Sequence, residues 1–249
     1  MNPGIKYEGQ DARRSFWRYF SYVKKCEHEA SVQTFREEFR QDIGRRYVGW
    51  GHFAFTTLTC VAVIAFALSR VRSPSWLELL VVPAGFLIAN LVEYLGHKGP
   101  MHHPRKGLRL IHTRHTVQHH HFFTRGSMSC EIPRDFKIML FPPSLLLFFF
   151  GGIAAPLGLL FYLALSPNSG WLFAATGVGY YLTYEWLHFA YHLPDDSVVG
   201  RLRLVRVLRA HHAHHHDLAL MGRYNFNITF PIFDAVFGTT YRGEQTTKE

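Results

Sequence analysis

The chain alternates between long apolar runs and polar segments that are rich in histidine and basic residues. Four apolar runs cover residues 51–71, 76–96, 138–165 and 171–193. Each is close to the ~20 residues that cross a hydrocarbon core of about 30 Å. Turn-forming residues separate the runs of each pair, at residues 72–75 and 166–170. The pattern predicts an all-α integral membrane protein with four transmembrane helices.

The third run contains several helix-breaking residues, among them Pro142, Pro143 and Pro156. It is therefore either one kinked helix or two short pieces. After the fourth run, residues 199–210 predict a basic amphipathic helix on the inner leaflet, since Leu202, Val205 and Leu208 recur every three residues. We expect three parts: a cytosolic amphipathic segment over 1–50, a membrane domain over 51–240, and a polar tail over 241–249.

The distribution of Lys and Arg along the chain predicts the orientation of the spans in the membrane. Of the 27 Lys and Arg, ten precede residue 52, eight lie between 97 and 137, and seven follow residue 194. Arg70 and Arg72 alone lie between the first two runs, and none lies between the last two. The positive-inside rule therefore predicts cytoplasmic N- and C-termini and a cytoplasmic central segment. The net charge of +9 is explained by topology and a lipid surface, and no motif points to nucleic acid.

Histidine is concentrated beside the apolar runs. Fifteen of the 17 histidines lie in residues 97–121, 188–192 and 211–216. Neutral imidazole is the commonest metal ligand in proteins. All three stretches adjoin the predicted cytoplasmic ends of spans, so the sequence predicts a cytosolic, histidine-rich helical cap that holds metal.

The spacing within the last two stretches fits helix faces. His188 and His192 are four residues apart and share a face. His212, His215 and His216 share a face if the amphipathic helix continues, whereas His211, His214 and His215 form an alternative register with the same spacing. We favour the first register because His212 continues the apolar face.

The first stretch is less regular. His112, His115, His119 and His120 span an arc of about 140° on a helix, which is wide enough to serve two metals. His97 and His102 flank Pro100, so we expect them to straddle a helix end, with His97 finishing the second span. His103 and His121 are expected to be solvated surface histidines.

Ten histidines are the preferred ligands, with His112 as a further candidate: His97, His102, His115, His119, His120, His188, His192, His212, His215 and His216. Ten is too many for one metal, so two metals would each receive about five and keep open positions. Imidazole suits iron, zinc and copper alike. Glu93 and Glu185 are expected to accept hydrogen bonds from the outer N–H groups of ligand histidines. Asp217 and Asp234 are weaker candidates for that role.

These histidine boxes resemble the fatty acid hydroxylase and sterol desaturase superfamily of integral membrane di-iron oxygenases. The boxes are His97-KGPM-His102, His115-TVQ-His119-His120, His188-FAY-His192 and His212-AH-His215-His216. The tail from Asn225 to Thr229 and from Phe233 to Thr239 is also similar to the family's ending. The resemblance implies two iron ions, dioxygen as co-substrate, and a lipid chain held between the spans.

The resemblance implies hydroxylation of a fatty acyl, sphingolipid or sterol-like C–H bond, with lipid desaturation at the same centre as the alternative. Because the chain lacks the HPGG motif of fused cytochrome b5 domains, the expected electron donor is a separate ferredoxin- or cytochrome b5-type protein with its reductase. A histidine-rich metal transporter is a more distant alternative, since transport sites place ionisable residues within the spans. A carboxylate di-iron bundle needs two Glu-x-x-His motifs, and only Glu185 and His188 form one.

Overall fold

The structure is a computed structural model, and it describes residues 29–243. The chain divides into two compact units, Met1–Asp42 and Ile43–Glu249. In the first unit the described residues form a helix over 29–41. Most of the expected amphipathic N-terminal segment, residues 1–28, and the end of the expected polar tail, residues 244–249, lie outside the described residues.

In the second unit every regular element of the described residues is a helix, as the sequence predicts, and no strand forms there. Its helices are α2 (Gly49–Ser69), α3 (Trp76–Leu79), α4 (Val81–Gly96), η1 (His97–Met101), α5 (Arg109–His112), η2 (Thr113–His119), α6 (His120–Phe122), η3 (Pro133–Asp135), α7 (Phe136–Met139), α8 (Pro143–Phe149), η4 (Phe150–Ala154), α9 (Ala155–Ala164), α10 (Pro167–Tyr191), α11 (Arg203–His215) and α12 (Ile232–Val236).

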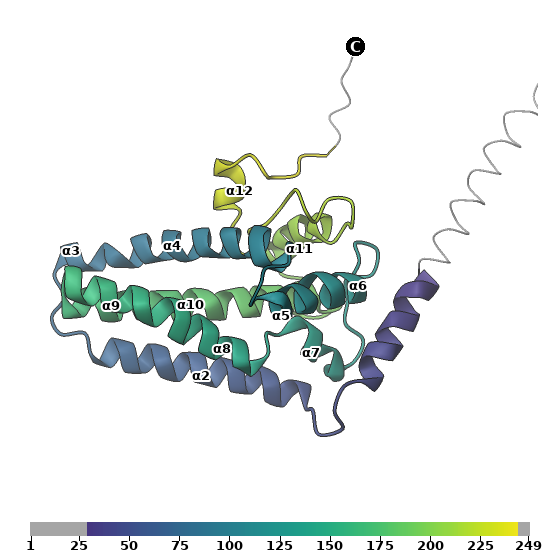
Figure 1. Ribbon diagram of the computed structural model, residues 1–249, viewed down its shortest axis with the longest axis horizontal. Helices are drawn as coiled ribbons and strands as arrows, with labels where there is room; N and C mark the ends of the chain where they lie inside the picture. The colour runs from purple at the N-terminus through teal and green to yellow at the C-terminus, as the bar shows by residue number, and fades with distance from the viewer. Residues whose placement is uncertain (1–28, 244–249) are drawn as a thin grey trace, which may run out of the picture. The chain divides into compact units, whose positions relative to one another are not determined.

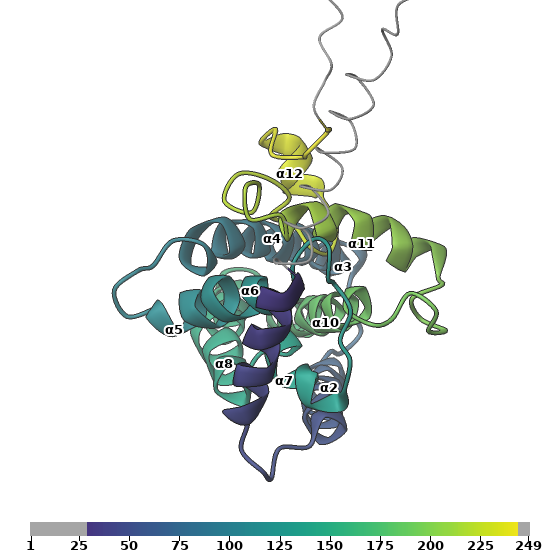
Figure 2. The same ribbon diagram turned by 90° about the vertical axis from the view of Figure 1, so that its right-hand side faces the viewer.

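Helix α10 is the centre of this unit. It packs against α9, α2 and α4, which run alongside it (Figure 1), and Figure 2 shows it end-on among its neighbours. The helix begins where the hydroxyl of Ser166 accepts a hydrogen bond from the N–H of Ser169 at 3.1 Å, with Pro167 in the first turn. It ends three residues before Pro194. The short helices α5, α6 and α7 and the helix α11 gather at one end of the long helices.

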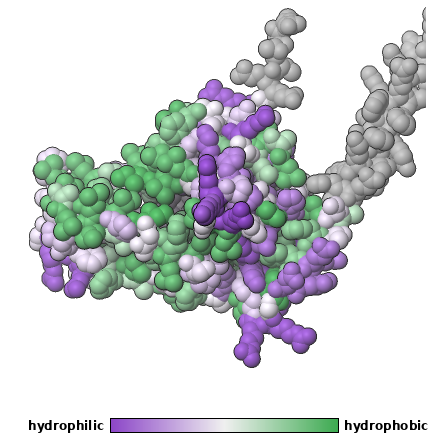
Figure 3. Space-filling model, in the orientation of Figure 1, coloured by the Kyte–Doolittle hydropathy of each residue, from purple (hydrophilic) through white to green (hydrophobic). Residues whose placement is uncertain are grey.

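Three helical stretches are long and apolar enough to cross a membrane: Gly49–Ser69, Trp76–Met101 and Pro133–Ala164. They correspond to the first three predicted spans. The fourth, residues 171–193, is helical as expected but is not among the three. Because α10 is surrounded by other helices, it carries buried polar side chains such as Tyr184 and Glu185 where an outer helix would need apolar ones. Hydrophobic residues dominate the surface over the long helices (Figure 3).

The third stretch consists of one separate helical turn followed by one continuous but irregular helix. Helix α7 is a separate turn, and Leu140, Phe141 and Pro142 interrupt the helix after it. From Pro143 onward α8, η4 and α9 run without a break through Ala164. The π-turn η4 lies just before Pro156, which occupies the first turn of α9. A π-turn is one of the recognised ways in which a helix absorbs such an irregularity.

Helix α11 begins at Arg203, four residues later than predicted. Leu202 therefore lies before the helix and is 54% exposed, whereas Val205 and Leu208 are buried as expected. The buried face continues through His212 and His215. The helix thus carries the last histidine stretch into the interior, which the amphipathic pattern predicts.

Candidate metal centre

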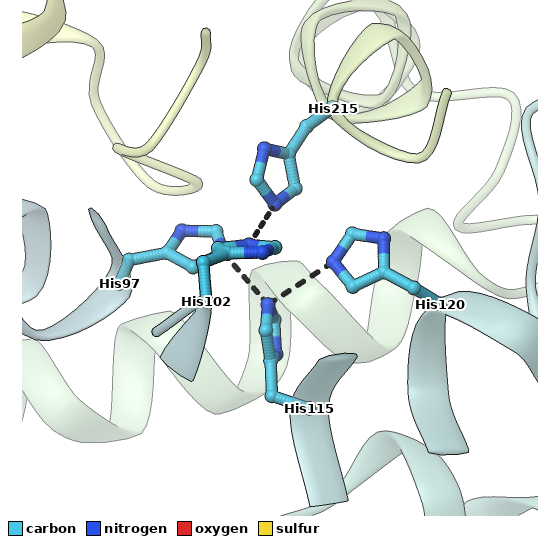
Figure 4. A group of neighbouring side chains, drawn as sticks. All are labelled: His97, His102, His115, His120 and His215. Atoms are coloured by element: carbon cyan, nitrogen blue, oxygen red, sulfur yellow. Dashed lines mark hydrogen bonds between the residues drawn. The ribbon is translucent and has the colours of Figure 1, made fainter. Parts of the chain in front are cut away.

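All ten predicted ligand histidines are buried, and the most exposed of them, His102, is 8% accessible. They converge into two groups of five. The first histidine group contains His97, His102, His115, His120 and His215, and the second contains His119, His188, His192, His212 and His216. In each group one nitrogen from every ring lies within 4.8 Å of the others. Figure 4 shows the rings of the first group pointing toward one another from separate segments.

Two breaks in regular α-helix build the first group. Helix α4 ends at Gly96, and Gly99 has non-helical backbone angles before Pro100. His97 and His102 therefore straddle a helix end, as predicted. The second break is the π-helix η2, which a 100° helical wheel does not describe. Because a π-helix joins residues five apart, His115 and His120 meet in the first group while His119 turns to the second.

The second group uses ordinary helix geometry. His188 and His192 lie one turn apart near the end of α10, and His212 and His216 repeat that spacing at the end of α11. His119 completes the group from η2. The i, i+4 pairs of the sequence therefore meet in one group, and α11 contributes to both groups because His215 faces the first.

Seven of the ten outer ring nitrogens, Nδ1, face oxygen atoms of the protein, whereas those of His120 and His212 are buried without a hydrogen-bond partner. Six donate to main-chain carbonyls: His97 to Phe226 (2.5 Å), His119 to Ile138 (3.1 Å), His188 to Met139 (3.1 Å), His192 to Met128 (2.8 Å), His215 to Tyr224 (3.0 Å) and His216 to Phe123 (2.6 Å). His102 donates to the hydroxyl of Thr116 at 3.2 Å, and that hydroxyl gives its own proton to the Met101 carbonyl. A neutral ring that donates from Nδ1 keeps a bare lone pair on Nε2.

These lone pairs face one another at short range. The Nε2 atoms of His102 and His215 are 2.9 Å apart, and those of His119 and His188 are 3.1 Å apart. Figure 4 marks the contacts in the first group with dashed lines. Burial lowers the pKa of His102 to about 2 and the pKa values of His119 and His215 well below the ordinary range. The rings are therefore neutral, and no proton lies between the paired nitrogens.

Opposed lone pairs repel unless a cation lies between them. Two imidazole nitrogens bound at right angles to one metal, at about 2.1 Å each, lie about 3.0 Å apart. The closest Nε2 separations in both groups, from 2.8 Å for His97 and His115 to 3.3 Å for His192 and His212, match that spacing. The donor set of each group therefore fits a metal ion.

The remaining described histidines near the site lie outside both groups. His103 and His121 are exposed, as predicted, and His112 is half-buried at the end of α5. His211 and His214 also remain outside, whereas all three histidines of the favoured register are group members, His215 in the first group and His212 and His216 in the second.

The expected carboxylate partners are placed differently. Glu93 accepts hydrogen bonds from the N–H groups of Ile228 and Thr229, and Glu185 lies 3.4 Å from the N–H of Phe141. The prediction that these carboxylates bond ligand histidines is wrong, because main-chain carbonyls occupy the outer nitrogens of His97 and His188. No side-chain pattern in the sequence marks those carbonyls.

The two aspartates also act elsewhere. Asp217 pairs with Arg125 at 3.1 Å near the surface. Asp234 is fully buried, and its two oxygens accept the N–H groups of Phe226 and Asn227 at 2.9 and 2.7 Å. It therefore touches the segment whose carbonyl holds His97, and it does not touch a histidine of either group.

An apolar cavity leads to the first histidine group. It has a volume of about 210 Å³ and lies between α4, η1, α8, η4, α9 and α10. Its walls include Ile88, Val92, Phe149, Ile153, Leu157 and Phe173, and His97 of the first group also lines it. A smaller cavity is lined by His115, His119 and His188, and Phe141 and Tyr184 line both cavities. Sequence reasoning did not single out Phe141 or Tyr184, since neither belongs to a histidine box.

Comparisons with known proteins agree with this arrangement. The family model described as "Fatty acid hydroxylase" matches residues 82–239, more than half of the 249 residues, and this range holds all ten histidines. The fold is similar to that of the solved structure described as "Full length scs7p (only hydroxylase domain visible)", with a TM-score of 0.55. That alignment has 21% identity and covers 78% of this chain and 67% of the other, so it speaks for the fold alone. No curated protein sequence matches the chain.

Proposed function

Since this chain belongs to the fatty acid hydroxylase family, we propose that it is a membrane-bound, dioxygen-dependent hydroxylase of a lipid C–H bond. The substrate would be a fatty acyl, sphingolipid or sterol-like molecule. The observation that carries this proposal is the apolar cavity that His97 lines. A cavity with such walls would admit the hydrocarbon chain of a lipid to a cluster of buried imidazoles and would exclude polar substrates.

The proposed cofactor is a pair of iron ions, one for each histidine group. Imidazole ligands fit iron, zinc and copper, and the choice of iron rests on the family. Bound iron would supply the activation of dioxygen that C–H hydroxylation requires. With five histidines around each metal, a coordination position would stay open for oxygen or water.

The protein's own residues would orient the lipid and exclude water. The aromatic and aliphatic walls of the cavity favour an alkyl chain, because burial of apolar surface is worth roughly 25 cal/mol per Å². The acidic group on that wall, Glu93, is already bonded to Tyr180, Thr229 and the N–H of Ile228. Glu93 therefore offers no free charge to the substrate. This supports a lipid substrate whose hydrocarbon chain is apolar where it passes α4.

The same proposal includes the topology. Four spans, with α10 as the fourth, would place both termini and the histidine groups on the cytoplasmic side, as the distribution of Lys and Arg favours. A ferredoxin- or cytochrome b5-type protein with its reductase would then deliver electrons from the cytosol.

The test is lipid mass spectrometry of cells that express the chain, compared with cells that express His192→Ala. A lipid that gains one oxygen only with the unaltered chain supports hydroxylation. A lipid that loses two hydrogens instead assigns desaturation, the alternative reaction of the same centre. Lipid profiles identical in both cultures, with the protein present in the membrane, would overturn both.

A further inference from the structure

Residues 224–229 form a segment that touches two histidines of the first group from outside; we call it the bracket loop. The carbonyl of Phe226 accepts from Nδ1 of His97 at 2.5 Å, and the carbonyl of Tyr224 accepts from Nδ1 of His215 at 3.0 Å. Asn225, between them, has a φ of 60°, a left-handed conformation that asparagine tolerates. This turn lets both carbonyls face histidines that belong to helices far apart in the sequence.

Two buried carboxylates hold the other side of the bracket loop. Asp234 accepts the N–H groups of Phe226 and Asn227, and Glu93 accepts those of the next two residues, Ile228 and Thr229. Four successive main-chain amides are thus anchored by two side chains, one from α12 and one from α4. Because each of these amides is held by a buried side-chain oxygen, the loop has little freedom to rotate its carbonyls.

We propose that Asp234 and Glu93 are positioning residues for the first histidine group, acting through the main chain of the bracket loop. By fixing the peptide between Phe226 and Asn227, they keep the Nδ1–H of His97 outward and its Nε2 inward, and they hold in place the loop whose Tyr224 carbonyl faces His215. This inference rests on the proposed metal-dependent function. It replaces the direct carboxylate–histidine contact expected from sequence with an indirect one.

The bracket loop serves one group only. Four outer nitrogens of the second group bond to carbonyls of Phe123, Met128, Ile138 and Met139, which belong to other segments, and the fifth, of His212, has no hydrogen-bond partner. Loss of the bracket should therefore weaken one metal site and spare the other. A general loss of stability would instead affect both sites alike.

Asp234→Asn is the informative change. Each carboxylate oxygen faces a main-chain N–H, so the amide nitrogen of asparagine must face one of them and leave it unsatisfied. Glu93→Gln is milder, because one oxygen of Glu93 accepts both N–H groups while the other faces hydroxyls of Thr229 and Tyr180, which can accept from an amide. Glu93→Ala removes both acceptors and is the second disruptive variant.

The experiment loads the purified full chain with Fe²⁺ under anaerobic conditions, challenges it with a chelator series, and counts metal by mass spectrometry. The unaltered chain and Glu93→Gln should hold two metals. In Asp234→Asn and Glu93→Ala the weaker metal should bind about 10–100-fold less tightly, as is typical when outer partners of ligands are removed. These variants should then retain about one metal at chelator concentrations that leave two in the unaltered chain.

The matched control is Asp135→Ala, compared with Glu93→Ala. Asp135 is buried, and one of its oxygens accepts two main-chain N–H groups, those of Glu131 and Ile132 at 2.9 and 3.2 Å, as one oxygen of Glu93 does, yet it anchors a different segment. This variant should keep two metals even if its unfolding temperature falls. Two tightly held metals in Asp234→Asn, or equal loss of both metals in the Asp234 and Asp135 variants, would overturn the proposal. An unaltered chain that holds two metals but forms no oxidised lipid would count against the proposed function alone.

Discussion

Mild acid should destabilise the metal-free protein, because the histidines of both groups are buried in neutral form. Burial lowers the pKa of His216 to about 4 and the pKa of His102 to about 2, whereas imidazole in an unfolded chain has a pKa of about 6.5. Between these values the unfolded chain binds protons that the folded chain excludes. The stabilisation is therefore complete above about pH 6.5 and is lost as the pH falls toward the folded pKa values.

The size of the effect follows from these two residues. At about pH 5.5, one unit below the unfolded pKa, each neutral histidine costs about 1.4 kcal/mol. His102 and His216 together therefore lower the free energy of unfolding by about 3 kcal/mol. In a chain of this size about 1 kcal/mol moves the unfolding midpoint by ~2–4 °C, so the midpoint should fall by roughly 6–12 °C. The other buried histidines of the two groups add to this loss.

The assay is thermal unfolding of the chelator-stripped, detergent-solubilised chain, followed by tryptophan fluorescence at pH 7.5 and 5.5. Ordinary carboxylates titrate near about pH 4, below this interval. Reloading with metal at about 100 times the dissociation constant should add about 2.7 kcal/mol for each site. The same measurement on a stripped His102→Gln, His216→Gln double variant identifies the share of the fall that comes from these two imidazoles. A change in midpoint between pH 7.5 and 5.5 that is the same in the double variant and in the unaltered stripped chain would refute their burial in neutral form.

Four substitutions should separate chemistry from folding. His192→Ala should abolish the formation of oxidised lipid while the protein remains in the membrane. His121→Ala, which alters an exposed histidine, should leave product formation close to that of the unaltered chain, and an inactive His121 variant would show that the site extends further. Lipid mass spectrometry measures the product of both variants, and immunoblots of membranes measure their amounts. Gly177→Leu should fill the apolar cavity and reduce product with both metals retained, and full activity would mean that the lipid takes another route. Glu185→Gln should keep both metals, because Glu185 does not contact His188; metal loss in that variant would contradict this placement.

The sequence predicted the parts of the site that depend on regular helices. The spacing of His188 and His192 places both on one face of α10 in the structure. The amphipathic pattern that ends at Leu208 correctly favoured His212 over His211. Both inferences succeed because 100° per residue describes an α-helix over one or two turns. Whether these histidines bind metal stays a prediction.

The central stretch shows where such reasoning stops. A helical wheel groups His115 with His119, which lies about 40° away, and sets His120 apart. The structure groups His115 with His120, because η2 is a π-helix. Propensity and hydrophobic periodicity carry no signal for a π-turn. The predicted fourth span shows a related limit, since polar residues in α10 reflect burial by neighbouring helices that appear only in the folded chain.

The outer partners of the histidines explain why acidic residues near the boxes were misassigned. A main-chain carbonyl accepts the Nδ1–H of six rings, and every residue type supplies a carbonyl, so sequence cannot name the acceptor. The accepting carbonyl must nevertheless be held in place, and particular side chains are needed to hold it. Asn225 permits the left-handed turn, and Asp234 and Glu93 anchor the amides beside it. Acidic residues near histidine boxes are thus informative about the loops that orient ligands as well as about the ligands themselves.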